Sequence, residues 1–413
     1  MKRKKKGKRM KNKNIIIILL IALVFISCKG QTSDVEIIDI KKIAGDYKRE
    51  NTFKLSEELL ANKKEELSSF KLFAAGDIMF HEPQIPAAKT EDGYDFKDSF
   101  RYLNFILKDG YAVANFESTI ADKNFSGYPM FRTPIEAMDG IKSGGFDLLA
   151  LANNHSLDGK KEGVFRTREA AISRGFSVTG THASEDTRPT IVEIAGRPIA
   201  FLNYTYGVNG LEAFLGEDEH LVNRIEEEKI LEDIAYAKEH AKGIIAVVHW
   251  GTEYRLEPDK YQEYWADFMA KNGVDIILGS HPHVIEPAKW LDRGEDQKED
   301  KVYCIYSMGN FLSNQRREYM NGSAHGEDGV IVELEVVPVG DRITAKKVVY
   351  HPTWVDRSKN PTKFTIIPVE MGLSGIIPEL DEFVISRLKE SSARTRAILG
   401  GDAINPAFEG EYR

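Results

Sequence analysis

The sequence predicts a mixed α/β fold. Three observations indicate it: short apolar runs alternate with segments of helical apolar spacing, most runs end in polar residues, and 42% of the 413 residues are hydrophobic. Two cysteines are too few for a disulfide framework, and a chain of this length can bury one large core or two modest ones. The sequence is therefore that of a globular protein for most of its length.

The first residues have the composition of an export signal. Nine of residues 1–13 are Lys or Arg, and residues 15–26 form an apolar run too short to span a bilayer. Ser27 and Cys28 follow, and the ending Phe-Ile-Ser-Cys resembles a bacterial lipobox, in which Cys28 is lipidated. Residues 1–27 are therefore predicted to be a lipoprotein signal peptide, with the chain exported and lipid-anchored in a bacterial cell envelope. The alternative is an uncleaved signal anchor.

The charge of the exported chain bears on its partners. Without residues 1–27 the 56 basic residues fall to 47 while the 64 acidic residues stay, which gives a net charge of −17. Such a chain repels nucleic acid and anionic lipid surfaces, so no nucleic-acid partner is expected. An anionic substrate then has to be held locally, by metal ions or a few placed cations.

Composition divides the rest of the chain. Residues 28–69 are rich in Lys, Glu, Asp and Ser, with an amphipathic stretch near 55–67, and are predicted to form a tether and a short helix. Residues 70–355 form the predicted α/β domain. Residues 356–413 are predicted to be a C-terminal extension, with one helix near 379–391 and a weakly specified tail after it.

Within the domain, seven apolar runs are predicted strands: residues 72–75, 111–116, 147–152, 199–204, 244–248, 274–278 and 302–306. Residues 224–241 and 258–272 have helical spacing, and the second begins with a proline and ends before Gly273. Residues 329–337 and 343–350 alternate as strands do.

Polar residues follow six of the seven runs. Those singled out are Asp77, Glu117, Asn154, His155, His249, His281, His283 and Asn310. Singly, a strand-end Asp is usually a helix cap, an Asn pair a turn, and a His a loop residue. Ligands of α/β sheets nevertheless bind beyond the carboxyl ends of strands, and two carboxylates, an amide and three imidazoles suit a pair of divalent ions. The coincidence favours a metal centre.

Other common chemistries have no support in the sequence. It contains no Walker-type phosphate loop, no G-x-G-x-x-G and no G-x-S-x-G. Cys304, within an apolar run, is predicted to be an inert buried residue.

With these residues in view, the chain resembles the poly-γ-glutamate capsule biosynthesis proteins of the CapA/PgsA type. These are bacterial envelope proteins related to the calcineurin-like metallophosphoesterases. The motifs, in the family's order over about residues 70–335, are Gly76-Asp77-Ile-Met79, Asn115-Phe-Glu117, Asn153-Asn154-His155, Tyr204-Thr-Tyr-Gly207, His249-Trp-Gly-Thr-Glu253-Tyr254, Gly279-Ser-His281-Pro-His283 and Ser307-Met-Gly309-Asn310-Phe311.

The resemblance implies a four-layer α/β/β/α sandwich of the metallophosphoesterase type with two divalent metal ions (Mn, Fe or Zn). Asp77 and His283 would hold the first ion, and Glu117 would bridge both. The second ion would be held by Asn154, His249 and His281.

The chain departs from the parent superfamily at two positions. Met79 stands where the superfamily has a histidine, and Glu117 stands where it has an aspartate. A thioether is a poor ligand for a hard or borderline ion, so the first site is expected to be weaker or changed unless His81 supplies the missing imidazole.

The remaining roles are a mechanistic hypothesis built on the chemistry of these residues. His155, which the resemblance leaves near the substrate, would be the catalytic residue and would protonate the leaving oxygen or stabilise developing charge. Glu253 and Asn310 are expected just behind the ligands, with Glu253 orienting His249. Arg132 or Arg316 would bind an anionic substrate, with simple surface charge as the alternative.

Two functions stay open at this point. The first is a metal-dependent hydrolase of a phosphoester or polymer-related linkage in capsule synthesis. The second is a non-catalytic surface factor for assembly, export or anchoring of an anionic polymer. The expected partners are that polymer or a phosphoester substrate, a membrane-bound polyglutamate ligase complex, and the membrane through the N-terminal lipid.

Overall fold

The computed structural model describes residues 69–294, 301–359 and 361–400. The predicted signal peptide, Cys28 and the tether as far as residue 68 lie outside these ranges. Within them, none of the helices combines the length and the hydrophobicity that a bilayer crossing requires.

The larger of two main sheets has eight strands. They are β1 (Phe70–Ile78), β2 (Tyr111–Phe116), β5 (Leu148–Ala150), β6 (Ser177–Thr179), β13 (Asn310–Leu312), β14 (Asp328–Val339), β15 (Arg342–Asp356) and β16 (Thr365–Pro368). Their order is β16-β15-β14-β1-β2-β5-β6, and β13 also pairs with β1. β1, β2, β5 and β6 are parallel, so their carboxyl ends share one edge.

The smaller main sheet has six strands. They are β7 (Thr190–Ile194), β8 (Arg197–Thr205), β9 (Ile244–His249), β10 (Ile276–Ser280), β11 (Ile285–Asp292) and β12 (Lys301–Met308). Their order is β11-β12-β10-β9-β8-β7, with β8, β9, β10 and β12 parallel. A separate parallel pair joins β3 (Thr119–Ile120) to β4 (Arg132–Thr133).

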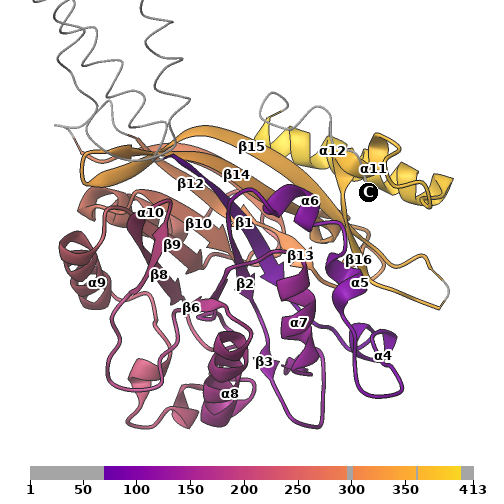
Figure 1. The fold of residues 1–413 in the computed structure, drawn as a ribbon, viewed down its shortest axis with the longest axis horizontal. Coiled ribbons are helices and arrows are strands. Elements are labelled where there is room, and N and C mark those ends of the chain that lie inside the picture. Colours follow the sequence, from indigo (N-terminus) through magenta and orange to yellow (C-terminus); the bar gives the residue numbers. More distant parts are fainter. Residues whose placement is uncertain (1–68, 295–300, 360, 401–413) are drawn as a thin grey trace, which may run out of the picture. The chain divides into compact units, whose positions relative to one another are not determined.

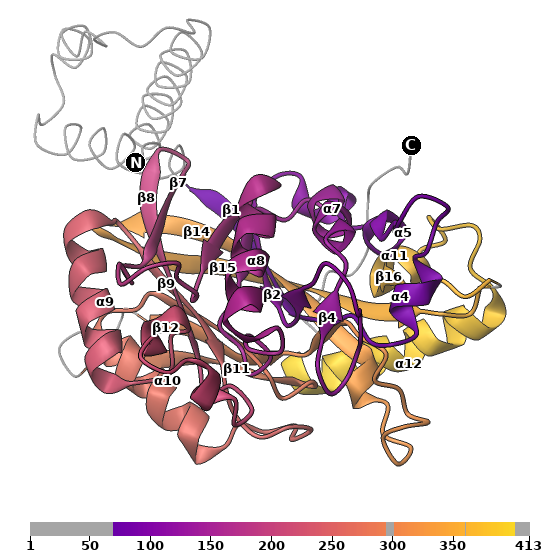
Figure 2. The same cartoon turned by 90° about the horizontal axis from the view of Figure 1, so that it is seen from below.

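Helices cover the outer face of each main sheet (Figure 1 and Figure 2). The helices are α4 (Gln84–Ala87), α5 (Lys97–Phe100), α6 (Asn104–Leu107), α7 (Glu136–Ser143), α8 (Lys160–Ser173), α9 (Glu227–His240), α10 (Lys260–Asn272), α11 (Val369–Leu373) and α12 (Glu382–Leu399). Helices α5 to α8 pack on the larger sheet, and α9 and α10 pack on the smaller one. A third core lies between the sheets. The four-layer α/β/β/α sandwich is confirmed.

Strand β1 shows why the predicted strands are continuous apolar runs. Its residues Leu72 and Ala74 face the core between the sheets, while Phe73 and Ala75 face the helices. Because both faces of the strand are covered, both sets of side chains must be apolar.

Capping residues at both ends of α10 determine where the helix begins and ends. The Asp259 side chain accepts a hydrogen bond from the Gln262 backbone N–H, and the Gln262 side chain accepts one from the Asp259 backbone N–H. Gly273, with φ of 120°, ends the helix. This reciprocal cap and the terminal glycine match the helix predicted over 258–272.

The C-terminal part continues the same compact unit. Strand β15 runs through residue 356, β16 pairs with it, and α11 and α12 share a core with Trp354 and Ile367. The predicted domain boundaries are not tested by this arrangement. The prediction of a weakly specified tail from Ser392 is wrong as far as residue 399, because α12 continues there with Ser392 and Thr395 buried.

Candidate metal centre

The carboxyl ends of the parallel strands in both sheets bring the six predicted ligands to one place. They lie in β1 (Asp77), just after β2 (Glu117), after β5 (Asn154), at the end of β9 (His249) and after β10 (His281 and His283). All six are buried, with exposed fractions of 0 to 3%. Residues that are far apart in the sequence therefore share one interior site.

Short distances join these side chains. His283 Nδ1 lies 3.1 Å from Asp77 Oδ2, and His283 Nε2 lies 3.8 Å from Glu117 Oε1. His249 Nε2 lies 3.6 Å from Glu117 Oε1 and 3.0 Å from Asn154 Oδ1. The Glu117 carboxylate therefore occupies the middle of the cluster.

Two groups, each made of three side chains, have ligand atoms that all lie within 4.8 Å of one another. One is Glu117, His281 and His283, and the other is Asp77, Glu117 and His249. Glu117 belongs to both, as a bridging residue should. The histidines divide differently from the predicted assignment to two ions, so which ligand serves which ion stays a prediction.

Several buried atoms in the cluster have no hydrogen-bond partner among the described residues. They are both carboxylate oxygens of Glu117 and Nδ1 of His281. An unsatisfied buried polar atom costs roughly 1–3 kcal/mol, and more when it is charged. Carboxylate oxygen and imidazole nitrogen are ordinary ligands of divalent transition ions, so the donor set fits a metal site.

The electrostatics of the cluster point the same way. Burial and the charge of Asp77 raise the pKa of Glu117 well above its usual range. Burial and the neighbouring imidazoles lower the pKa values of His249 and His281. Neutral imidazoles keep a lone pair for a metal, and a cation would stabilise the buried carboxylate.

Polar neighbours hold the ligands in place. The Asn115 amide donates to Asp77 Oδ1 at 2.7 Å and lies 3.2 Å from His249 Nδ1, which also lies 3.0 Å from Ser280 Oγ. The Asn310 amide donates to the His283 carbonyl at 3.0 Å. Asn310 thus lies behind a ligand, where the sequence placed it.

Glu253 does not occupy its predicted position. Its side chain is exposed, and among the described contacts no hydrogen bond or ion pair joins it to His249. Ser280 and Asn115 contact His249 Nδ1 instead, because His249 ends β9 directly beside the end of β10. The residue that orients His249 is therefore not Glu253.

His155 lies beside the cluster on the side of the larger sheet. Its Nδ1 is 2.7 Å from Asp158 Oδ2, which also accepts the backbone N–H of Phe131 at 2.5 Å. The rings of Phe131 and His155 meet edge to face at 4.7 Å. Asp158 had no role assigned from the sequence, although its spacing three residues after His155 in a turn is a usable signal.

Met79 and His81, which lie shortly after Asp77 in the sequence, have different surroundings. Met79 is buried, and its backbone N–H donates to the Leu312 carbonyl at 2.8 Å. His81 Nδ1 accepts the backbone N–H of Asn314 at 3.2 Å, and its pKa is lowered to about 3 by burial and the charge of His283. His81 is near His283 but belongs to neither ligand group within the described chain.

The two predicted substrate-binding arginines lie in different surroundings. Arg316 is buried, donates to the Val355 carbonyl and lies 5.0 Å from the Trp354 ring centroid. Arg132 lies in the short β4 strand, and its Nε is buried without a hydrogen-bond partner among the described residues. Among the described ion pairs and hydrogen bonds, neither arginine joins the six-residue cluster, and their role in binding a substrate stays a prediction.

Two tyrosines without a predicted role cover the imidazoles from the side of the smaller sheet. The Tyr206 ring centroid lies 4.5 Å from that of His281 and 6.4 Å from that of His249. The Tyr254 ring lies 6.0 Å from that of His283. Their position in two of the quoted motifs was the available signal.

Backbone strain gathers at the same loops. His281, His283 and Tyr254 have φ values of 100°, 58° and 64°, in the left-handed region that residues with side chains seldom adopt. Such strain persists where the surrounding structure fixes it, and it is common at functional sites.

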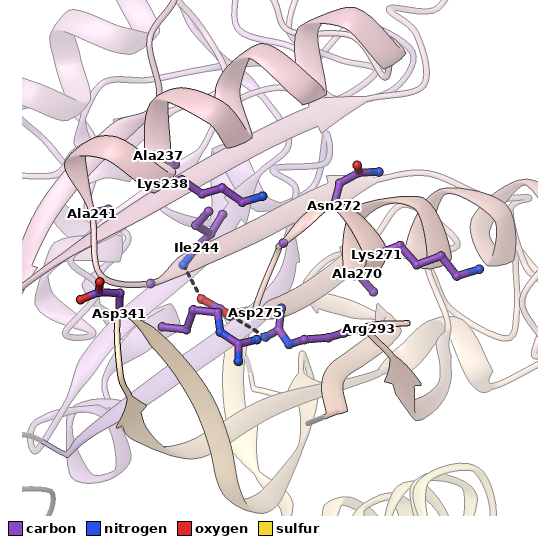
Figure 3. Close-up of a pocket in the computed structure, with 13 residues that line it drawn as sticks. Ala237, Lys238, Ala241, Ile244, Ala270, Lys271, Asn272, Asp275, Arg293 and Asp341 are labelled. Carbon is purple, nitrogen blue, oxygen red and sulfur yellow. Dashed lines mark hydrogen bonds and ion pairs between the residues drawn. The ribbon is translucent and has the colours of Figure 1, made fainter. Parts of the chain in front are cut away.

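A cavity of about 420 Å³ lies elsewhere, at the opposite ends of β9 and β10 (Figure 3). Asp275 in its wall accepts hydrogen bonds from the Ile244 backbone N–H at 2.9 Å and from Arg293 at 2.5 Å. Lys238 and Lys271 lie near the ends of α9 and α10, where cations balance the helix carbonyls. These contacts explain the cavity as structural, and it shares no residue with the metal cluster.

The chain is an α/β sandwich whose buried carboxylate–imidazole cluster, at the edge shared by its two sheets, has a donor set that fits a metal site. A family model described as "Bacterial capsule synthesis protein PGA_cap" matches residues 71–315, more than half of the chain. The chain belongs to this family of bacterial capsule synthesis proteins.

Two curated relatives are similar over much of their length. The "PGA biosynthesis protein CapA" of Bacillus subtilis is 28% identical over 248 residues, which cover 58% of this chain and 62% of the relative. The "Capsule biosynthesis protein CapA" of Bacillus anthracis is 28% identical over 302 residues, covering 69% of this chain and 70% of the relative. The chain therefore spans less than two thirds of the first relative.

Solved structures resemble the chain more distantly. The calcineurin-like phosphoesterase YfkN of Bacillus subtilis has a TM-score of 0.41 and 13% identity, covering 79% of this chain and 98% of that one. The sulfate thiohydrolase SoxB of Thermus thermophilus has a TM-score of 0.38 and 12% identity, covering 73% and 46%. These scores are too low to support an argument about the chemistry of this chain.

Proposed function

We propose that this chain is a metal-dependent hydrolase of capsule synthesis that acts on a phosphoester or a polymer-related linkage, with two divalent ions. The observation that carries the proposal is the group of buried, unpartnered donor atoms on Glu117 and His281. A bound cation would offset the cost of burying these atoms without partners.

Different residues of the site would have different roles in the reaction. Asp77, Glu117, Asn154 and the three imidazoles would hold the ions, which when bound would lower the pKa of a water and offset charge on a phosphoryl group. Asp158 would accept a hydrogen bond from Nδ1–H of His155, and the ring in its doubly protonated form would give the proton on Nε2 to the leaving oxygen. Burial of the cluster excludes bulk water and strengthens these interactions.

The location follows from the N-terminal sequence. The chain would be exported and held at the cell envelope by a lipid on Cys28, with no nucleic-acid partner. Its partners would be an anionic polymer or phosphoester substrate and a membrane-bound polyglutamate ligase complex. The names of the two CapA relatives support this biological setting.

A non-catalytic surface factor for polymer assembly, export or anchoring is the second candidate. Met79 favours it, because this buried thioether stands where the parent superfamily supplies an imidazole. A weakened first site would leave the fold intact while its chemistry is lost.

The test separates these two functions. The full chain is purified, its bound metal is measured by mass spectrometry, and phosphomonoesters and phosphodiesters are assayed beside Glu117→Ala, His283→Ala and the control His240→Ala, an exposed residue of α9. A hydrolase binds metal and turns over ester, and both properties vanish in the first two variants only. Absent metal, with capsule formation restored equally by all variants, would establish the surface factor instead.

A further inference from the structure

We propose that the metal centre takes a phosphodiester, a monoanion with two organic arms, and that Tyr206 and Tyr254 bind the uncharged arm that does not leave. This inference deepens the proposed function and rests on its metal site. It names the class of substrate that the residues lining the site would favour.

The site has two walls that come from different sheets. His81, Phe131 and His155 come from segments that follow β1, β3 and β5, on the side of the larger sheet. Tyr206 and Tyr254 follow β8 and β9 of the smaller sheet. A phosphoryl group held between the walls, with its leaving oxygen at His155, has its other substituents directed toward the tyrosines.

Backbone hydrogen bonds fix the two tyrosines to the ligand loops. The Tyr206 N–H donates to the His249 carbonyl at 2.9 Å, and the Tyr254 N–H donates to the Pro282 carbonyl at 2.7 Å. Pro282 lies between His281 and His283. Each ring is therefore placed by the same backbone that places the ligands, as a wall of the site should be.

The tyrosines also leave surface free for a substrate. One face of Tyr206 packs on His281 and His249, yet the residue is 41% exposed, and Tyr254 beside His283 is 46% exposed. The hydroxyl of Tyr206 lies near the Asn154 side chain, and that of Tyr254 accepts from the Gln315 amide at 3.2 Å. Large rings with few rotatable bonds make good contact surface at low entropic cost.

The charges around this wall disfavour a second negative charge on the substrate. The acidic side chains of Glu253 and Glu117 lie close enough to the Tyr206 hydroxyl to interact with it electrostatically. Glu253 interacts in the same way with the Tyr254 hydroxyl. Within the described residues, the ion pairs of Asp77 and Glu117 go to histidines, not to Lys or Arg. A charged group that contacts the tyrosines, away from the ions, would therefore meet the acidic Glu253, whereas an uncharged arm can stack on the rings and accept hydrogen bonds from the phenols.

Binding measurements test the preference for a phosphodiester without relying on enzymatic turnover. The full chain is loaded with Mn²⁺, and its affinities for diphenyl phosphate, phenyl phosphate and inorganic phosphate are measured by calorimetry. We expect diphenyl phosphate to bind about tenfold more tightly than either of the others, the gain expected from two ring contacts.

Variants assign the preference to the rings. The double variant Tyr206→Ala/Tyr254→Ala should lose the preference and keep its affinity for inorganic phosphate. Tyr206→Phe, which keeps the ring, should retain the preference even if loss of the hydroxyl disturbs Asn154. Tyr264→Ala removes an exposed tyrosine of α10 and is the matched control, which should behave as wild type. Melting curves confirm that each variant is folded.

Each outcome decides between claims. Equal or tighter binding of phenyl phosphate, or a full diester preference in the double alanine variant, would overturn the inference. A diester preference without hydrolysis of any ester would support the inference and refute the proposed hydrolase. If none of the three phosphates binds to the metal-loaded chain, both are wrong.

Discussion

At the scale of single residues, the contact between His155 and Asp158 has a direct chemical consequence. The carboxylate fixes the proton on Nδ1 and so leaves Nε2 free for proton transfer. Asp158→Asn keeps an acceptor for the Phe131 N–H but removes the charge that stabilises the imidazolium form. We expect kcat to fall about 100-fold, with KM and metal content unchanged, since general acid catalysis contributes at least that much. The control is Asp122→Asn, which alters an exposed ion pair with Arg166. Unchanged kcat in Asp158→Asn would remove His155 from the proposed chemistry.

Glu117 makes the stability of the metal-free chain depend on pH. Because burial and Asp77 raise its pKa in the folded state, the folded chain binds this proton more tightly than the unfolded chain does. The free energy of unfolding therefore falls as pH rises from about 4.5 toward the raised pKa. The lowered pKa values of His249 and His281 act in the opposite sense, but their effect is complete above about pH 6.5.

The change in the free energy of unfolding with pH can be measured. In chelator, urea unfolding from about pH 6.5 to 8.5 should show wild type losing stability with pH relative to Glu117→Gln, which cannot ionise there. With Mn²⁺ present the order should reverse, because only the carboxylate is stabilised by the ion. Parallel pH profiles for the two proteins in chelator would contradict the assignment of this effect to Glu117.

At the scale of elements, two glycines let β1 approach the turn between β12 and β13. A Cβ on Gly76 would lie 2.0 Å from the Gly309 carbonyl oxygen, while the Asp77 N–H donates to that same oxygen at 3.1 Å. Gly76→Ala must therefore separate β1 from the turn and displace Asp77. We expect a loss of about 1–3 kcal/mol in the free energy of unfolding, together with weaker metal binding.

A matched substitution tests the cause. A Cβ on Gly163, within α8, would lie 3.6 Å from Thr119, an ordinary contact distance. Gly163→Ala should be neutral or stabilising, because alanine is the better helix former. Equal stability and equal metal affinity in Gly76→Ala and Gly163→Ala would show that the close approach of β1 has no role in placing Asp77.

The C-terminal helix is fixed by a buried ion pair. Arg394 of α12 contacts both oxygens of Asp328 at 2.6 and 2.8 Å, and Asp328 begins β14, an inner strand of the larger sheet. Burial nevertheless raises the pKa of Asp328 to about 6. Arg394→Ala leaves this carboxylate without its cation and should cost about 3–5 kcal/mol at neutral pH, measured by chemical denaturation. Arg387→Ala, which removes a partly exposed pair with Glu390, should cost less than about 1 kcal/mol. Similar losses in the two variants would contradict the special role of the buried pair.

At the scale of the whole molecule, the predicted lipid anchor would decide where the proposed chemistry takes place. In cells, Cys28→Ser should abolish lipid attachment and shift the protein from the membrane fraction to the soluble fraction, while the metal content of the purified protein stays as in wild type. Metabolic labelling with a fatty-acid analogue and cell fractionation measure the two effects. Labelling that persists in the variant would place the attachment elsewhere, and absence of labelling in wild type would exclude it.

Much of the fold could be predicted from the sequence, for a physical reason. Strands covered on both faces must be apolar throughout, so the runs at 111–116 and 244–248 match β2 (Tyr111–Phe116) and β9 (Ile244–His249) closely. Strand β11 was not predicted, because it lies at the edge of its sheet and mixes Glu286 and Lys289 with apolar residues. The helix near 379–391 was placed too early, since its true cap is Asp381 and its last turns are stabilised by contacts to distant residues.

The sequence by itself determined the alternation of elements, the family motifs and the residue types at the strand ends, because apolar periodicity and turn chemistry are local properties. Only the tertiary structure decided that Ser280 and Asn115 contact His249 where Glu253 had been expected. It also showed that Arg316 packs on Trp354, and that Tyr206 and Tyr254 cover the imidazoles. These contacts depend on how two sheets pack at a shared edge, and no spacing along one chain encodes the distance between side chains that meet there.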